Sequence, residues 1–418
     1  MPYVSTRGQR LPSSPIRKLV PFAEAAKARG TKVYHLNIGQ PDIPTPPSAL
    51  QAVRDADISV LAYSHSAGNE SYRRKLAEYY ATFGVEIDHH NVLVTAGASE
   101  AIQFTIMSCL DPEDEIIVPE PFYANYNGFA LAGNVNVVPV TAVIEDGFAL
   151  PPIPDFEDLI TPRTRAILIC NPSNPTGYLY TRHELEQLRD LCLKHNLFLM
   201  VDEVYREFVY GQEHTSVLAL EGLEMNAIVF DSISKRYSAC GARIGCVVTR
   251  NQQVYDTIMK FAQARLSPPT LAQILAEATL DVGPEYLEEA IAEYANRREL
   301  LVARLRAMDG VVCPEPGGAF YLFARFPVDD TENFCRWLLE SFEHEGATLM
   351  MAPGEGFYST AGLGRQAARL AYVLNEADIN AAMDVLQAAL LAYPGRTPTR
   401  VPQEMKSELA PEAFELGD

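Results

Sequence analysis

The sequence predicts an α/β protein with a large domain, in which helices cover both faces of a mostly parallel sheet, and a smaller α+β domain. Two observations carry this prediction. Between about residues 50 and 300, short apolar runs alternate with stretches of helical periodicity, which is typical of parallel strands joined by crossover helices. The regions before and after it each combine short strands with helices, and we expect them to form the smaller domain together.

The first 50 residues contain eight prolines and are expected to form an extended arm, a helix at about 16–29 and a strand at 33–38. The strands of the large sheet are predicted at 92–95, 115–119, 166–170, 197–201, 227–230 and 244–249, with a helix at 101–110 after the first. Further on, the pattern predicts a helix at 285–308, a strand at 318–326, a helix at 332–346, a strand at 369–373 and a helix at 377–393.

One helix start is marked by a capping box, Thr181-Arg182-His183-Glu184, in which the Thr hydroxyl and the Glu carboxylate accept each other's free N–H groups. Together the predicted elements divide the chain into four parts. We expect an arm and part of the small domain at 1–50, the large domain at 51–299 and the small domain at 300–395. Residues 396–418 contain three prolines, carry three basic and five acidic residues, and are predicted to be a flexible tail.

The charge balance disfavours two classes of partner. There are 34 Lys and Arg against 54 Asp and Glu, which gives a net charge of −20. Nucleic acids and anionic membranes attract proteins of the opposite sign, so neither is an expected partner. An ordinary cytoplasmic enzyme accounts for this charge, and adaptation to high salt is the alternative.

The cysteines and the apolar runs bear on the compartment. The seven cysteines include no Cys-x-x-Cys, which disfavours a disulfide framework and a zinc ribbon. No apolar run reaches the roughly 18 residues of a membrane span, and no signal peptide is apparent. We therefore expect a cytoplasmic protein. The pair His89 and His90 is assigned to a turn, since adjacent side chains point apart and no third ligand is near, and no metal is expected.

Polar and reactive residues follow the predicted strands of the large sheet. In open α/β sheets, ligands bind beyond the carboxyl ends of the strands, so these residues are expected to meet in one site. They are Gly97-Ala98-Ser99, Tyr123, the segment 171–177 (Asn-Pro-Ser-Asn-Pro-Thr-Gly), Asp202 with Tyr205, and Ser232-Ile233-Ser234-Lys235.

Lys235 is one of only eight lysines, and Arg243 follows it between small residues. A single lysine is usually a surface charge, but its compact amine also suits a Schiff base. Arg243 would then bind a phosphate through its fork of donors, and the turn at Gly97 would offer free N–H groups to the same anion. Asp202 could be a helix cap, or it could pair with a cationic ring nitrogen such as that of pyridoxal phosphate (PLP).

These motifs resemble the class I/II aminotransferases, PLP enzymes of fold type I, the aspartate aminotransferase fold. The resemblance covers about residues 15–390, with the motifs in order and at family-like spacing. The motifs are Gly-x-Pro-Asp-x-Pro-Thr-Pro at 39–46, Thr-x-Gly-Ala at 95–98, Asn-Pro-x-Asn-Pro-Thr-Gly at 171–177, Asp-Glu-x-Tyr at 202–205, and Ser-x-Ser-Lys with Gly-x-Arg-x-Gly within 232–245.

The resemblance implies a role for each matching residue. Lys235 would form the Schiff base with PLP and move the substrate α-proton, while Asp202 would pair with the ring nitrogen. Tyr205 and Asn174 would bind the ring hydroxyl, and Tyr123 would stack on the ring. The phosphate would be held by Gly97, Ala98, Ser99, Ser232 and Arg243, and by Tyr63 of a neighbouring subunit, which implies a homodimer. Arg369 would bind the substrate α-carboxylate, assisted by Gly39 and Asn174.

The resemblance also implies a transaminase that moves the amino group of an L-amino acid to a 2-oxo acid such as 2-oxoglutarate by a ping-pong mechanism. Aspartate is the best guess for the donor. Arg17, in the N-terminal arm, or Arg265, near Ser267-Pro268-Pro269, could bind a side-chain carboxylate, and surface charges remain the alternative for both.

Other reactions remain open. A carbon–sulfur β-lyase or another PLP enzyme, such as a cyclopropane-forming synthase, could use the same fold. A PLP-binding regulator would need an added DNA-binding domain, and a nicotinamide dehydrogenase would need the Gly-x-Gly-x-x-Gly fingerprint, which does not open the helix after the first strand.

Overall fold

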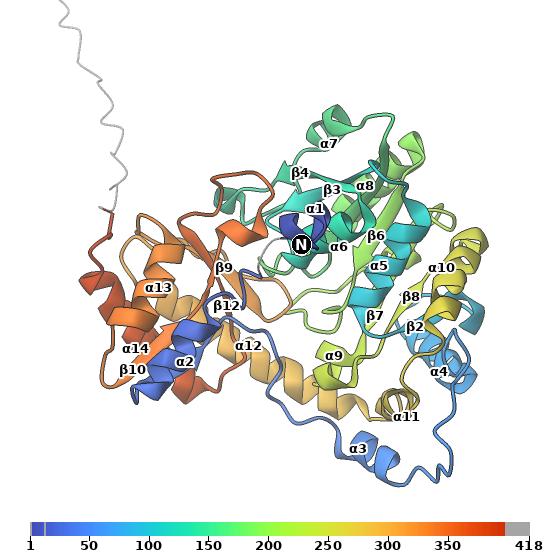
Figure 1. The fold of residues 1–418 in the computed structure, drawn as a ribbon, viewed down its shortest axis with the longest axis horizontal. Helices are drawn as coiled ribbons and strands as arrows, with labels where there is room; N and C mark the ends of the chain where they lie inside the picture. The colour runs from blue at the N-terminus through green and yellow to red at the C-terminus, as the bar shows by residue number, and fades with distance from the viewer. Residues whose placement is uncertain (1, 12–13, 398–418) are drawn as a thin grey trace, which may run out of the picture.

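The centre of the protein is a seven-stranded sheet, seen in a computed structural model that describes residues 2–11 and 14–397 (Figure 1). The strand order is β2-β8-β7-β6-β5-β3-β4, and among these strands only β8 runs antiparallel to its neighbours. The prediction of a mostly parallel sheet is therefore confirmed. The strands are β2 (Val92–Thr95), β3 (Glu115–Glu120), β4 (Asn136–Thr141), β5 (Thr164–Cys170), β6 (Phe198–Asp202), β7 (Ala227–Ser232) and β8 (Gly245–Val248).

The middles of the central strands are apolar because hydrophobic cores cover both faces of the sheet. Successive residues of a strand point to opposite faces, so Ile228 and Phe230 pack in one buried cluster while Val229 packs in the other. The helices of this part are α3 (Pro47–Arg54), α4 (Glu70–Ala81), α5 (Ala98–Cys109), α6 (Asn125–Gly133), α7 (Ile153–Leu159), α8 (Arg182–His195), α9 (Ile233–Arg236), α10 (Gln252–Arg265) and α11 (Thr270–Thr279).

The edge strand β4 was missing from the strands predicted from the sequence. Its sequence is Asn-Val-Val-Pro-Val-Thr, and Pro139 lies in its middle. Proline cannot donate to a strand ladder, so it is tolerated where one side of the strand has no neighbour. The proline that weakens the strand pattern thus suits the position of β4 at the end of the sheet.

The two ends of the chain meet in the smaller sheets. Strand β1 (Lys32–His35) pairs in parallel with β10 (Ala347–Met350), and β11 (Ala352–Pro353), β12 (Ala367–Ala371) and β9 (Tyr321–Arg325) form an antiparallel sheet. The helices here are α2 (Val20–Ala28), α12 (Pro284–Arg306), α13 (Thr331–Ser341) and α14 (Glu376–Ala392). One buried cluster runs from the large sheet into this part. The four-part division of the chain stays a prediction.

Several predicted boundaries shift for local reasons. The helix predicted at 16–29 begins at Val20, and Pro21 stands in its first turn, where the missing N–H costs nothing. The helix predicted at 101–110 begins earlier, at Ala98, because Gly97 adopts a φ of +80° as its N-cap. The capping box of Thr181 and Glu184 at the start of α8 is confirmed.

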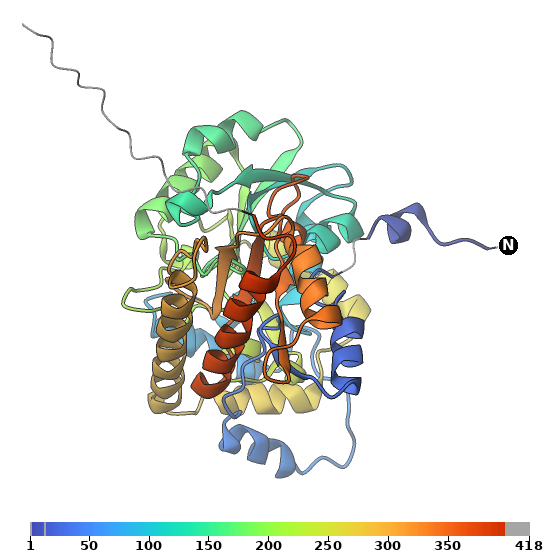
Figure 2. The same ribbon diagram turned by 90° about the vertical axis from the view of Figure 1, so that its left-hand side faces the viewer.

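The N-terminal arm carries a short helix, α1 (Thr6–Arg10), which stands away from the body of the molecule (Figure 2). None of its residues is buried, and Arg7 donates a hydrogen bond to the Ala132 carbonyl. The predicted flexible tail lies outside the described residues from 398 on. Within the described ranges, no helix is both long enough and apolar enough to cross a membrane.

Candidate active site

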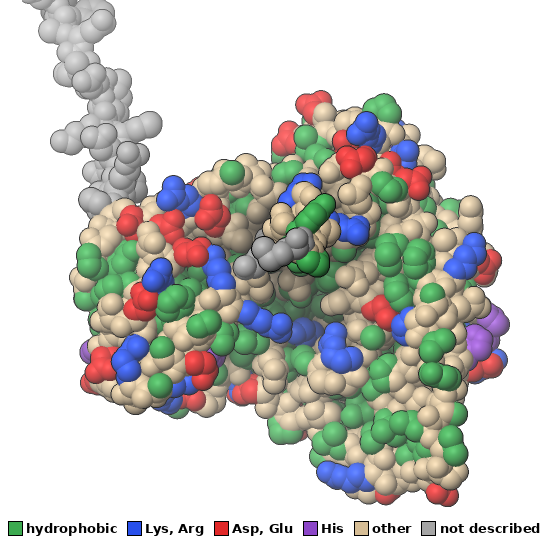
Figure 3. Space-filling view, in the orientation of Figure 1, with side chains coloured by type: hydrophobic (Ala, Val, Ile, Leu, Met, Phe, Trp, Pro, Cys, Tyr) green, Lys and Arg blue, Asp and Glu red, His purple; other side chains and the backbone are tan. Residues whose placement is uncertain are grey.

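A cavity of about 610 Å³ lies at the carboxyl ends of the large-sheet strands, facing β9 and β12. The structure brings the predicted site residues together around it, except Gly97 and Tyr63, which are not among its lining residues. Figure 3 shows Lys and Arg side chains along the hollow near the middle of this face. The lining residues taken from the predictions are Gly39, Ala98, Ser99, Tyr123, Asn174, Asp202, Tyr205, Ser232, Lys235, Arg243 and Arg369, together with Arg17.

Lys235 lies in α9, the single helical turn that follows β7. Its Nζ donates a hydrogen bond of 2.8 Å to the Gly39 carbonyl and lies 3.9 Å from Cys240 Sγ. The side chain is half-buried and forms no ion pair with a carboxylate of the described residues. A half-buried amine without a carboxylate partner is well suited to react with a carbonyl and to transfer protons.

Asp202 is the last residue of β6 and is buried. Tyr126 donates to its Oδ2 at 3.0 Å, and the Val204 N–H approaches its Oδ1 at 3.4 Å. Burial raises the pKa of Asp202 to about 6, because the carboxylate has lost water and gained no cation within bonding distance. A cationic ring nitrogen would supply the missing partner.

An anion site lies between the start of α5 and Arg243. The N–H groups of Ala98 and Ser99 have no intrahelical acceptor at this helix start. A Cβ atom at Gly97 would overlap the Arg243 guanidinium, and one at Gly245 would overlap the Gly97–Ala98 backbone, so both glycines permit this close approach. Arg243 is exposed, its Nη1 donates to the Cys240 carbonyl at 2.9 Å, and it has no carboxylate partner in the described part of the chain. Free N–H groups and an unneutralised guanidinium are the donors that a phosphate requires.

Arg369 lies in β12 and is only 1% exposed. Its Nη1 donates to Asn174 Oδ1 at 2.9 Å and its Nη2 to the Asn37 carbonyl at 2.6 Å. Its Nε has no hydrogen-bond partner, although it is buried. A buried guanidinium with neutral neighbours and an unused donor is prepared to bind a carboxylate, because few other partners repay its loss of water.

Two tyrosines of the site were not predicted from the sequence. Tyr126 positions Asp202, and Tyr321 lines the cavity with its hydroxyl 2.9 Å from that of Tyr205. Tyr126 lies one helical turn after Tyr123, a spacing that could have drawn attention to it. Tyr321 lies inside a predicted strand and not at its carboxyl end, so only the packing of β9 against the large sheet reveals it.

Three other predicted features lie outside the cavity. Tyr63 is 78% exposed. Arg265 is bound to Glu100 at 2.6 Å and to the carbonyls of Ser66 and Val94. His89 begins a 3₁₀ turn, as expected, but the two reasons given against a metal were wrong: the His89 and His90 ring centres lie 3.9 Å apart, and Asp88 offers a third potential ligand atom there. Asp88 caps that turn, because its Oδ1 accepts from the His90 N–H at 2.9 Å.

Comparison with known proteins decides the family. The sequence matches the family Aminotransferase class I and II over residues 31–386. The chain belongs to this family. The aminotransferase is 35% identical over 330 residues to the putative aminotransferase YugH of Bacillus subtilis, covering 77% of this chain and 82% of that protein. It is 30% identical to an aspartate aminotransferase of Pyrococcus horikoshii, covering 93% of this chain and 97% of that one. A single mutant of Thermus thermophilus aspartate aminotransferase superposes with a TM-score of 0.86 at 28% identity, covering 93% and 100% of the two chains.

The aminotransferase is therefore a PLP-dependent enzyme that acts on amino acids and 2-oxo acids. The residues present fit this cofactor. The start of α5 and Arg243 suit its phosphate, the unpaired carboxylate of Asp202 suits its ring nitrogen, and Lys235 suits its aldehyde. When bound, PLP supplies an electron sink that lowers the cost of removing the substrate α-proton.

Proposed function

We propose that this aminotransferase takes the amino group from an acidic L-amino acid, with aspartate as the first candidate, and gives it to a 2-oxo acid such as 2-oxoglutarate. The two half-reactions follow each other in a ping-pong order. The observation that carries the acidic donor is that two guanidinium groups besides Arg243, those of Arg369 and Arg17, border the same cavity as Lys235. Burial raises the pKa of Tyr123 to about 12, and the positive charges of Arg369 and Arg17 oppose this rise.

The two arginines differ in what holds them. Arg369 is buried and fixed by Asn174 and the Asn37 carbonyl. Arg17 is exposed and has no hydrogen bond or ion pair with any described side chain. A substrate with two carboxylates could occupy both, its α-carboxylate at Arg369 and its side-chain carboxylate at Arg17.

The alternative cation from the sequence, Arg265, has less support. Its guanidinium already binds Glu100, and it does not line the cavity. Moving it to a substrate would leave Glu100 without its partner, at a cost similar to the gain. Arg17 therefore remains the better candidate for the side-chain carboxylate.

The remaining residues have simple proposed tasks. Lys235 takes the α-proton from the substrate at its Nζ and delivers it to the cofactor. Asp202 keeps its carboxylate facing the ring nitrogen through the hydrogen bond from Tyr126. Tyr123 covers the ring, and Tyr205 with Asn174 binds its hydroxyl oxygen. The buried positions of Asp202, Asn174 and Tyr205 keep water away from their side of the ring.

We further propose a cytoplasmic homodimer in which Tyr63 reaches the neighbouring active site. The seven cysteines are all unpaired, which suits a reducing compartment. The segment that carries Tyr63 also exposes Val60 and Leu61, and Ser66 bonds it to the carbonyl of the exposed Leu266. A second copy would cover these exposed apolar side chains. Sedimentation of the holoenzyme tests this, with about twice the mass of one chain expected.

The donor is tested by mixing the PLP-loaded enzyme with single L-amino acids and following the visible absorption of the cofactor. Aspartate and glutamate should react faster than alanine or phenylalanine without any 2-oxo acid present. Arg17→Gln should raise KM about tenfold for the acidic donors alone, as for the loss of a charged hydrogen bond. Arg369→Ala should raise KM for every donor.

Arg10→Gln is the matched control, because it removes the same charge from the exposed arm outside the cavity. Equal effects of Arg17→Gln on aspartate and alanine would contradict the acidic donor. Release of pyruvate and ammonia from cystathionine, without a 2-oxo acid acceptor, would instead indicate a carbon–sulfur β-lyase.

A further inference from the structure

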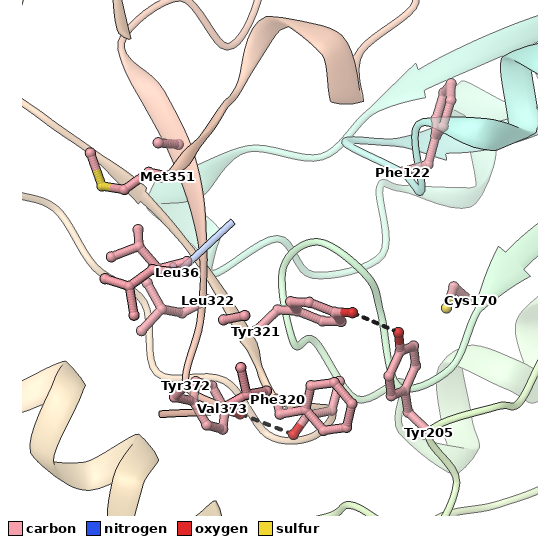
Figure 4. Packing of buried hydrophobic residues seen from close by; sticks show 14 of the residues in the cluster. Leu36, Phe122, Cys170, Tyr205, Phe320, Tyr321, Leu322, Met351, Tyr372 and Val373 are labelled. Carbon is pink, nitrogen blue, oxygen red and sulfur yellow. Dashed lines mark hydrogen bonds between the residues drawn. The ribbon is translucent and has the colours of Figure 1, made fainter. Parts of the chain in front are cut away.

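Tyr321 contacts more of the active site than any role assigned so far explains. Two acceptors lie within reach of its hydroxyl proton: the Tyr205 hydroxyl at 2.9 Å and, farther away at 3.5 Å, the Gly39 carbonyl, which already accepts from Lys235. Its ring lies 4.3 Å from the centre of the Arg369 guanidinium. Figure 4 shows the two tyrosine hydroxyls directed at each other across the space between β9 and the loop after β6. Tyr321 thus touches the proposed cofactor residue Tyr205 and the proposed substrate residue Arg369.

The hydroxyl of Tyr321 is held in place from several sides. Tyr321 is buried, and its ring packs edge-on against Tyr205, with the ring centres 5.5 Å apart. A Cβ atom at position 39 would overlap the Tyr321 hydroxyl, so Gly39 leaves space for this group. A rigid, buried hydroxyl facing another hydroxyl must form a defined hydrogen bond.

The direction of that hydrogen bond matters, because each hydroxyl has a single proton. If Tyr205 donates to Tyr321, it has no proton left for a ligand. If Tyr321 donates to Tyr205, the Tyr205 proton is free to point into the cavity. Burial first, and then the neighbouring Tyr321, raise the pKa of Tyr205 well above its usual value, so Tyr205 keeps its proton at neutral pH.

We propose that Tyr321 is a positioning residue whose hydroxyl donates to Tyr205 and thereby directs the Tyr205 proton to the ring oxygen of PLP. Its ring also holds the Arg369 guanidinium in the orientation that meets the substrate carboxylate. The first half of this inference rests on the proposed role of Tyr205. The charged or titratable groups around the Tyr205 side chain are Tyr321, Cys170, Arg369 and Lys235.

The test is Tyr321→Phe in the PLP-loaded enzyme, which removes the hydroxyl and keeps the ring. A hydrogen bond donated to the ring oxygen stabilises its unprotonated form. Weakening that bond should therefore move the midpoint of the pH titration of the cofactor's visible band upward by about 0.5–1 pH unit, the worth of one neutral hydrogen bond. The kcat should fall about 3- to 10-fold while KM for the donors stays within about twofold, since the ring still packs on Arg369. Tyr321→Leu should raise KM as well.

Tyr210→Phe is the matched control. Tyr210 is also a buried tyrosine, and it donates to the Ala319 carbonyl near the start of β9 without lining the cavity. It should leave the titration midpoint unchanged, although it also loses a buried hydroxyl.

The double variant Tyr205→Phe/Tyr321→Phe tests the role of Tyr321 separately from the proposed role of Tyr205. If Tyr321 acts through Tyr205, the second substitution should add no shift to that of Tyr205→Phe. A shift with Tyr205→Phe but none with Tyr321→Phe would overturn the inference and leave the role of Tyr205 intact. No shift with either variant would overturn both, and additive shifts would show that Tyr321 acts independently of Tyr205.

Discussion

Two groups of charged side chains lie next to each other at the carboxyl ends of β6 and β7. The charges of the first group pair with one another, and those of the second do not. The first is a buried ion network of Arg206, Glu207, Asp231 and Arg236. Arg206 and Arg236 each bind Asp231 at 2.7 Å, and Arg236 also binds Glu207 at 2.7 Å. Although burial raises it, the two arginines lower the pKa of Asp231 well below its usual range. The network's charges therefore stabilise one another.

The second group is the set of charges around the cavity. Asp202, Lys235, Arg243 and Arg369 form no ion pair within the described chain, although the chain places Lys235 directly before Arg236. Burial raises the pKa of Asp202 to about 6, the opposite direction from Asp231. The difference separates charges that are paired within the chain from charges that remain free to pair with a ligand.

The largest expected effect is the loss of activity on replacing Lys235, compared with the exposed Lys260. Lys235→Ala should lower transamination by about 10⁴-fold, the upper range for a positioned acid–base group, and should abolish the borohydride-reducible adduct with PLP. Lys260→Ala is the control, because Lys260 is exposed on α10. Mass spectrometry after reduction measures the adduct. An adduct that persists in Lys235→Ala would overturn the whole site assignment.

The sequence predicted the cavity side of this comparison far better than the network side. Lys235, Asp202 and Arg243 were found because turn residues and motifs mark strand ends. Arg236, Asp231 and Arg206 carry no such mark, since an arginine or aspartate in a sequence is usually exposed. Tyr321 and β4 were missed for related reasons: the contacts of Tyr321 form only when distant segments pack, and Pro139 disguises an edge strand.

The next effect tests the network. Arg236→Met should lower the unfolding free energy by about 3–5 kcal/mol, because Asp231 and Glu207 lose a partner while buried. The denaturation midpoint at fixed protein concentration measures this. Arg336→Met is the control, since Arg336 pairs with Glu340 on the exposed face of α13 and should change the midpoint little. Equal midpoints for the two variants would show that the network contributes no more than a surface pair.

The smallest effect has the opposite sign and involves Asp202. Its folded pKa of about 6 exceeds the ordinary value of 3.8, so the folded state binds the proton more tightly. The stability that this provides is present at low pH and is lost as the pH rises through about 6. In the cofactor-free protein at pH 8, Asp202→Asn should therefore raise the unfolding free energy, by up to about 3 kcal/mol, and at pH 5 the gain should be smaller.

PLP binding should reverse the order of stability of the wild type and Asp202→Asn. A cationic ring nitrogen stabilises the ionised Asp202 but gains little from an asparagine, so PLP should raise the melting temperature of the wild type more than that of Asp202→Asn. PLP affinity of the wild type should also weaken below about pH 6 more than that of the variant. Comparing the two proteins removes the effect of the cofactor's own phosphate, whose titration is the same in both. Asp231→Asn is the matched buried control and should be less stable with or without PLP. If Asp202→Asn were also less stable at pH 8 without PLP, Asp202 would belong with the self-paired charges, and the cavity would have one fewer group reserved for the cofactor.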